Sequence, residues 1–155
     1  MPRLLVPDEK RAIVAELVTR FGFPPDLFDP YLFLEQGRSI WVLRQTPYLE
    51  EVLTVVQRRV ETAGLRLLRR IQTQWKPTTY GLQLFGPYAT RNIVTLNDAE
   101  VRILFTEGRV RGPFALEEGY VIINSSLGVL GCGLYRGETL RSQIPRPRSR
   151  LVTSF

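Results

Sequence analysis

The sequence contains no histidine, one cysteine and two lysines, and these shortages narrow the chemistry open to it. Without histidine, it lacks the commonest metal ligand and the side chain most used for acid and base catalysis near neutral pH. A single thiol, Cys132, excludes an intrachain disulfide. No apolar run approaches the ~20 residues of a membrane helix, and the N-terminus lacks the hydrophobic stretch of a signal peptide. We therefore expect a cytoplasmic protein without a metal, a cofactor or a membrane partner.

The basic residues are almost all arginine. Lys10 and Lys76 stand beside nineteen arginines, and the formal net charge is +6. A guanidinium group fits phosphate and stacks on bases, so this bias favours a nucleic-acid partner, whereas a GC-rich genome or a thermophilic source would give the same count. Residues 1–75 carry a net charge of +2 and residues 76–155 one of +4, so the basic excess lies towards the C-terminus.

The apolar content of 44% over 155 residues predicts a folded chain of the α+β class. In its first part, the apolar spacing predicts, in order, a helix over 7–21, strands over 31–35 and 39–44, a helix over 46–63 and a strand over 65–71. The last of these strands alternates apolar residues with Arg66 and Arg70, which predicts one buried face and one basic face.

A boundary between two closely packed subdomains is predicted where Trp75 and Lys76 precede Pro77 and the charge balance changes. The subdomains are residues 1–75 and 76–150, with a tail over 151–155. In the second subdomain we expect a short helix over 78–84, a strand over 92–96, a helix over 97–105 and strands over 119–124, 128–135 and 139–144. Turns every few residues are typical of a small barrel or meander.

Gly128, Gly131 and Gly133 have the spacing G-x-x-G-x-G. A loop that cradles phosphate needs a helix after it, and no helix is predicted there. We therefore expect these glycines to allow a bulge, tight curvature or the close approach of another backbone.

Three segments of the second half resemble PUA-like domains, the small RNA-binding barrels named for pseudouridine synthases and archaeosine transglycosylases. The segments are Glu118–Asn124, Gly128–Gly137 and Leu140–Arg146, and Asn92–Phe105 is similar to the strand and helix that open such domains. The pattern is most similar to the C-terminal domain of Sun-type RNA cytosine methyltransferases. The N-terminal half more weakly resembles the α/β module that precedes a PUA domain in small ribosome-biogenesis factors. The resemblance implies an N-terminal α/β module packed on a C-terminal PUA-like β-barrel.

The catalytic groups of those methyltransferases are not recognisable in this sequence. Their chemistry needs a cysteine nucleophile and a separate fold that holds the methyl donor. Cys132 lies between two glycines of a predicted strand without a basic neighbour, which is typical of an inert core thiol. The pairs Glu50–Glu51 and Glu117–Glu118 are typical of solvated element ends. We expect no catalytic residue, and hence a protein that is not an enzyme.

The candidate RNA-binding residues are basic side chains of the second half, which would contact phosphate groups. They are Lys76, Arg91, Arg109, Arg111, Arg136, Arg141, Arg146, Arg148 and Arg150. Pro145 and Pro147 stiffen the backbone around the last arginines, for which a solvated tail is the alternative. Arg66, Arg69 and Arg70 are weaker candidates, because one face of a strand is usually solvated.

The resemblance implies a non-catalytic protein that binds structured ribosomal or transfer RNA. Such a protein would assist ribosome biogenesis, rRNA processing or RNA modification, beside a ribosome-assembly protein or a methyltransferase. An alternative is the RNA-binding subunit of a split RNA methyltransferase, for which a large apolar patch on the first subdomain would be evidence. A small enzyme would instead need a deep pocket with a strongly perturbed carboxyl group.

Replacing Arg146, Arg148 and Arg150 together with alanine should weaken binding to structured RNA and reduce its salt dependence. The reason is that each cation that neutralises a phosphate releases counterions. Titrations of a hairpin RNA at several salt concentrations measure both quantities. An unchanged affinity and an unchanged salt slope would remove the tail from the binding site.

Overall fold

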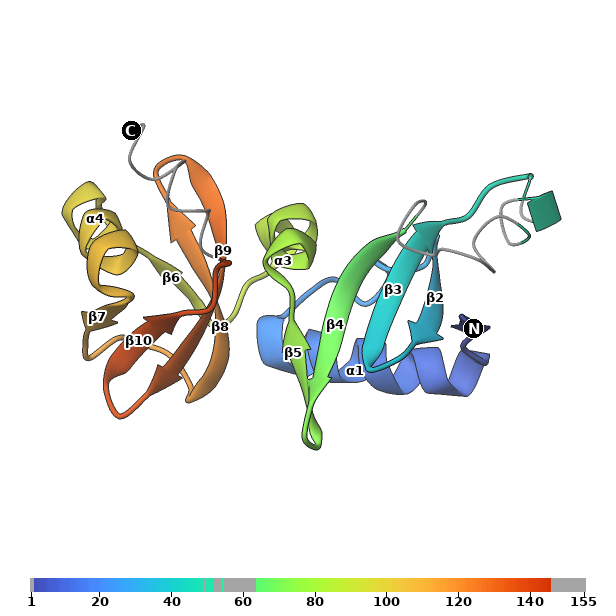
Figure 1. Ribbon diagram of the computed structural model, residues 1–155, viewed down its shortest axis with the longest axis horizontal. Coiled ribbons are helices and arrows are strands. Elements are labelled where there is room, and N and C mark those ends of the chain that lie inside the picture. The colour runs from blue at the N-terminus through green and yellow to red at the C-terminus, as the bar shows by residue number, and fades with distance from the viewer. Residues whose placement is uncertain (1, 49, 52–53, 55–63, 146–155) are drawn as a thin grey trace.

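The computed structural model describes residues 2–48, 50–51, 54 and 64–145. The chain forms two five-stranded sheets, each with a helix packed against it, and a short helix lies between them (Figure 1). The chain is therefore α+β, as the sequence predicts.

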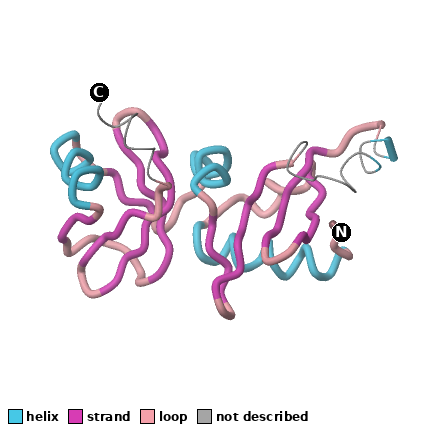
Figure 2. The backbone as a smooth tube through the Cα atoms, viewed as in Figure 1, coloured by secondary structure: helices cyan, strands magenta, loops and turns pink. Residues whose placement is uncertain are grey.

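The first sheet is antiparallel, with the strand order β1-β2-β3-β4-β5. The strands are β1 (Arg3–Leu4), β2 (Tyr31–Gln36), β3 (Ser39–Arg44), β4 (Leu65–Ile71) and β5 (Gln74–Pro77). Helix α1 (Pro7–Phe21) packs on one face of this sheet (Figure 2). It has Pro7 in its first turn and ends at Gly22, whose φ of 64° lies in the left-handed region. The predictions for α1, β2, β3 and β4 are confirmed, whereas β1 and β5 were not predicted.

The predicted helix over 46–63 falls mostly outside the described residues. Within it, Glu50, Glu51 and Thr54 are described and are helical, whereas residues 46–48 are described and lie before the helix, with a turn at 47 and 48. The predicted domain boundary at residues 75 and 76 falls inside β5, which pairs with β4.

Strand β4 departs from the predicted alternation. The register between β3 and β4 shifts, and two successive residues, Leu67 and Leu68, are both buried. Arg66 and Arg69 consequently lie on the face away from α1, while Arg70 lies on the α1 side. The prediction that Arg66 and Arg70 share one basic face was wrong, because a bulge reverses the alternation between them.

The second sheet follows helix α3 (Thr79–Phe85) and the 3-10 turn η2 (Gly86–Tyr88), and its strand order is β6-β8-β9-β10-β7. The strands are β6 (Ile93–Thr95), β7 (Arg109–Arg111), β8 (Gly119–Ser125), β9 (Gly128–Arg136) and β10 (Thr139–Ser142). Strands β6 and β8 are parallel, the other neighbours are antiparallel, and the sheet curls into a half-barrel (Figure 1). Apart from β7, these elements match the predicted ones.

Helix α4 (Asp98–Glu107) packs inside the curled sheet. Its start is fixed by a reciprocal cap, in which Asn97 Oδ1 accepts from the backbone N–H of Glu100 and Glu100 Oε1 accepts from that of Asn97. Its end is fixed by Gly108, which has a φ of 80°. From the sequence, either Asn97 or Asp98 is predicted as the N-cap and Gly108 as the end of the helix, and the structure has Asn97 and Gly108 in these places.

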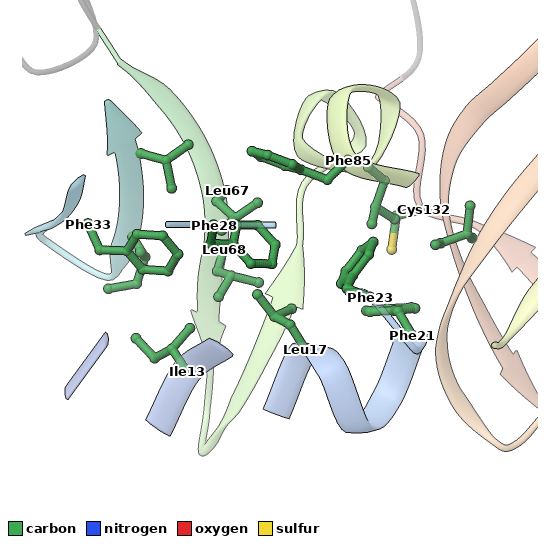
Figure 3. Packing of buried hydrophobic residues seen from close by; sticks show 14 of the residues in the cluster. Ile13, Leu17, Phe21, Phe23, Phe28, Phe33, Leu67, Leu68, Phe85 and Cys132 are labelled. Atoms are coloured by element: carbon green, nitrogen blue, oxygen red, sulfur yellow. The ribbon is translucent and has the colours of Figure 1, made fainter. Parts of the chain in front are cut away.

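The largest apolar cluster joins both sheets. At its centre, the ring of Phe28 lies between 4.8 and 5.8 Å from the rings of Phe23, Phe33 and Phe85. The cluster extends into the second sheet through Ile122 and Cys132 (Figure 3). A second cluster lies under α4 and consists of Val94, Leu96, Leu104, Val110, Val121, Ile123, Tyr135 and Leu140. The two sheets therefore share part of one core.

The C-terminal end of α1 is bonded to the segment that leads into β6. A helix leaves its last carbonyl groups without intrahelical partners. Residues 90–92 donate to the carbonyl oxygens of residues 19–22 at distances of 2.8 to 3.0 Å. The bonds run from Thr90 N and Arg91 N to Phe21 O, from Thr90 Oγ1 to Gly22 O, from Asn92 Nδ2 to Arg20 O, and from Arg91 Nη1 to Thr19 O.

Asn92 and Arg20 extend this junction to β8. Asn92 Oδ1 accepts from the backbone N–H of Glu117 at 2.9 Å, and Asn92 O accepts from that of Ile122 at 2.9 Å. Arg20 donates to the carbonyl oxygens of Tyr120 and Glu117, each at 2.9 Å. The second sheet is thus held against the end of α1 by directional bonds as well as by apolar packing.

Replacing Asn92 with alanine should lower the free energy of unfolding by about 1–3 kcal/mol, because the carbonyl of Arg20 loses a donor inside the junction. The φ of 55° at this position adds a backbone penalty, since alanine disfavours left-handed geometry. Urea titrations followed by tryptophan fluorescence measure the loss. The matched control is Asn124→Ala, which removes only an exposed bond to Thr95 and should change stability by about 0.5 kcal/mol or less. Equal losses in the two variants would contradict the role given to Asn92.

Candidate nucleic-acid interface

Four of the predicted arginines lie on the outer face of the second sheet, that is, the face that points away from α4. Arg109 in β7 is directly opposite Arg141 in β10. Arg111 and Arg136 are both opposite Thr139, from the two strands that flank it. Directly opposed residues of an antiparallel pair point to the same side of the sheet. We call Arg109, Arg111, Arg136 and Arg141 the arginine face, and all four side chains are exposed.

Side chains alternate between the two sides of the sheet along β7, β9 and β10, and this alternation determines the side on which the arginine face lies. The residues between the arginines, Val110 in β7 and Leu140 in β10, are buried under α4, as is Tyr135 in β9. A slip by one residue would bury guanidinium groups in this core, so the register is strongly specified.

The charges of the arginine face are not neutralised by other described residues. Within the described part of the chain, the arginines that form ion pairs are Arg3, Arg11 and Arg91. Like charges that face each other across a strand pair, as Arg109 and Arg141 do, destabilise the sheet. A bound anion would relieve this repulsion.

A groove of about 420 Å³ lies beside this face, between the two sheets. Strands β3, β4 and β5, helix α3 and the residues after β10 contribute its walls. Its charged, polar and aromatic lining includes Trp41, Arg66, Arg69, Lys76, Tyr80 and Gln143. The described lining residues include three cations and no acidic side chain. We call this hollow the junction groove.

Lys76 connects the junction groove to the arginine face. Its Nζ donates to Gln143 Oε1 at 2.8 Å and lies 6.0 Å from the centre of the Tyr120 ring. Gln143 continues the pairing of β10, because its N–H donates to Cys132 O at 2.9 Å. Arg141 precedes Gln143 by two residues, so both side chains point to one side and are about 7 Å apart along the strand. The arginine face therefore lies next to the junction groove at Arg141 and Gln143.

Arg91 lies apart from the other candidates. It forms an ion pair with Glu117 at 2.8 Å and donates to Thr19 O, so it is engaged in the junction with α1. It also precedes β6, at the opposite edge of the sheet from β7. The hydrogen bond from Asn92 and the charge of Arg91 hold the pKa of Glu117 below its ordinary value. The remaining candidates, Arg146, Arg148 and Arg150, lie outside the described residues.

Sequence reasoning gave little weight to Trp41, Arg66, Arg69 and Tyr80, which line the junction groove. The apolar pattern around Trp41 predicts that this side chain lies in the core. Arg66 and Arg69 were expected on a strand face that contacts only solvent. The bulge that turns these arginines towards the groove leaves no clear signal in the sequence. Tyr80 lies near the basic segments in the sequence, which makes it a candidate for stacking on a base. In the structure it points outwards, because Leu82 and Phe85 are buried on the other side of α3.

The glycines of β9 serve close packing. A Cβ atom on Gly133 would lie 2.8 Å from a side-chain atom of Ile123 and 2.9 Å from one of Leu140. A Cβ atom on Gly131 would meet Thr79, the first residue of α3. The expectation of close approach is confirmed for Gly131 and Gly133, whereas a Cβ atom on Gly128 would meet nothing within 4 Å.

Cys132 is completely buried in the cluster that both sheets share. This burial raises the pKa of the thiol to about 12. A thiol with that pKa carries almost no thiolate near neutral pH, so the position is unsuited to a nucleophile.

In the native protein, Cys132 should therefore not react with Ellman's reagent at pH 8, and the thiol should react once urea unfolds the chain. The absorbance of the released thiolate measures the reaction. A Ser126→Cys variant provides the positive control, since Ser126 is exposed in the β8–β9 turn and its thiol should react without urea. Rapid reaction of the native parent protein would contradict the burial of Cys132.

Within the described part of the chain, no cluster of three or more cysteine, aspartate or glutamate side chains is placed to hold a metal ion. None of the helices described there has the length and apolarity needed to cross a membrane. No model of a known protein family and no curated protein matches this chain. The basis for a functional proposal is therefore the arginine face and the junction groove beside it.

Proposed function

We propose that this protein binds structured RNA through the arginine face and acts by recognition, without a catalytic group of its own. The observation that carries the proposal is the placement of Arg109, Arg111, Arg136 and Arg141 on one outer face, with no carboxylate partner among the described residues. Guanidinium groups bind phosphate oxygens in a bidentate manner, so these four side chains suit a phosphate backbone.

The shape of the surface favours RNA over DNA as the ligand. Proteins that recognise the sequence of duplex DNA insert a helix or a two-stranded ribbon into the major groove. The arginine face instead spans three adjacent strands, β9, β10 and β7, of a curled sheet. Double-stranded RNA has a wide, shallow minor groove and is recognised mostly by its shape and its phosphates. A broad basic sheet face suits that mode of binding.

We further propose, on the resemblance described above, that residues 76–150 form a PUA-like domain and that the ligand is ribosomal or transfer RNA. The order of strand, helix and antiparallel strands from β6 to β10 supports this proposal, as does the curl of the sheet. The protein would then assist ribosome biogenesis or RNA modification by holding an RNA in place.

Replacing Arg109 and Arg141 together with alanine should weaken binding to a hairpin RNA by at least about tenfold. The slope of log affinity against log salt should fall by about 2, that is, by roughly one for each lost phosphate contact. Fluorescence anisotropy at several salt concentrations measures both quantities. The matched control is the double variant Arg38→Ala/Arg102→Ala, which removes the same charge from exposed positions away from the arginine face.

Three results would count against this assignment. Equal weakening in the two double variants would show that net charge, and not the arginine face, determines binding. Equal affinity for a DNA hairpin of the same sequence would contradict the preference for RNA. Failure of the parent protein to bind any structured RNA would contradict the proposed function and would favour a subunit that acts only when docked on a catalytic partner chain.

A further inference from the structure

We infer that the junction groove accepts one unpaired nucleotide of the bound RNA, with its base stacked on the aromatic side chains of the groove. This inference rests on the proposed function, because it assigns a second part of the same RNA to a second part of the same surface. It adds a binding site formed by both sheets, whereas the arginine face belongs to the second sheet alone.

The size and the charge of the groove suit a nucleotide. Its volume of about 420 Å³ lies within the range of roughly 300–1,000 Å³ that is usual for sites of small organic ligands. Arg66, Arg69 and Lys76 line it, and its described lining contains no acidic residue. An anionic ligand would therefore be attracted to these cations, and no carboxylate among the described lining residues would compete.

The aromatic residues of the groove supply surfaces for stacking. Tyr80 is 63% exposed, although its neighbours in α3, Leu82 and Phe85, are buried. An exposed aromatic ring on the wall of a groove contributes little to the core. Across the groove wall formed by β3 and β4, the guanidinium carbon of Arg66 lies 5.2 Å from the centre of the Trp41 ring. Unpaired bases stack on aromatic rings and on guanidinium planes, which both walls present.

Lys76 is oriented to hold the phosphate of such a nucleotide. An ammonium group has three donors, and one of them is used in the bond from Lys76 Nζ to Gln143 Oε1. That bond holds the side chain beside Gln143, which follows Arg141 by two residues. The phosphate backbone can then continue from Lys76 to the arginine face, where the paired part of the RNA would lie.

The experiment compares two hairpin RNAs that differ only in a short unpaired extension, using fluorescence anisotropy. The parent protein should bind the extended hairpin about tenfold more tightly than the blunt one, which corresponds to roughly one stacked base. Tyr80→Ala should lose this preference and still bind the blunt hairpin as the parent protein does. Tyr80→Phe should keep the preference, because the phenyl ring retains the stacking surface. Tyr88→Ala is the matched control, since Tyr88 is also an exposed tyrosine but does not line the groove.

A second measurement reports directly on Trp41. The sequence has two tryptophans, so a Trp75→Phe variant leaves Trp41 as the reporter. The extended hairpin should quench its fluorescence, and the blunt hairpin should leave it unchanged.

The possible failures can be told apart. If the parent protein binds neither hairpin, the proposed function itself is wrong. If it binds both equally, or if Tyr80→Ala keeps the preference, RNA binding stands and the nucleotide site is wrong. Quenching of Trp41 by free adenosine monophosphate without any preference for the extended hairpin would indicate a site for a free nucleotide, and would also overturn the inference.

Discussion

The contact between the two sheets depends on the bonded end of α1. The last carbonyl groups of this helix are satisfied by residues 90–92, which lie far from it in sequence and lead directly into the second sheet. Hydrogen bonds are directional, so this contact constrains the angle between the sheets in addition to the shared apolar core. The junction groove exists because the two sheets are held at that angle. Asn92 is central to it, since its side chain bonds both α1 and the segment before β8.

The basic residues of the arginine face and those of the junction groove are brought together in different ways. The arginine face follows from local strand pairing, because β7, β9 and β10 place their arginines on one side of a single sheet. The junction groove follows from the contact between sheets, because Arg66 and Lys76 come from one sheet and Gln143 follows a strand of the other. One surface is thus a property of the second sheet, and the other is a property of the assembled molecule.

Local signals in the sequence were sufficient for most elements and insufficient for the groove. Gly22, Asn97 and Gly108 mark helix ends that the structure confirms, because capping depends on a few neighbouring residues. The arginines of β7, β9 and β10 were identified by charge alone, and their shared face depends on a register that spacing does not reveal. Strand β7 has three residues, too few for a periodic pattern. The bulge in β4 and the role of Asn92 depend on distant partners, so neither was predicted.

Strand β7 is an edge of the second sheet, and two of its three residues are the exposed arginines of the arginine face. An edge strand presents unpaired backbone groups on which a strand of another molecule can add. Charged side chains oppose such pairing, and two copies that met edge to edge here would bring arginine against arginine. The same charges that suit a polyanion therefore also protect this edge from aggregation. Binding of a polyanion would leave this edge as protected as before, because the arginines point out of the sheet and not along its edge.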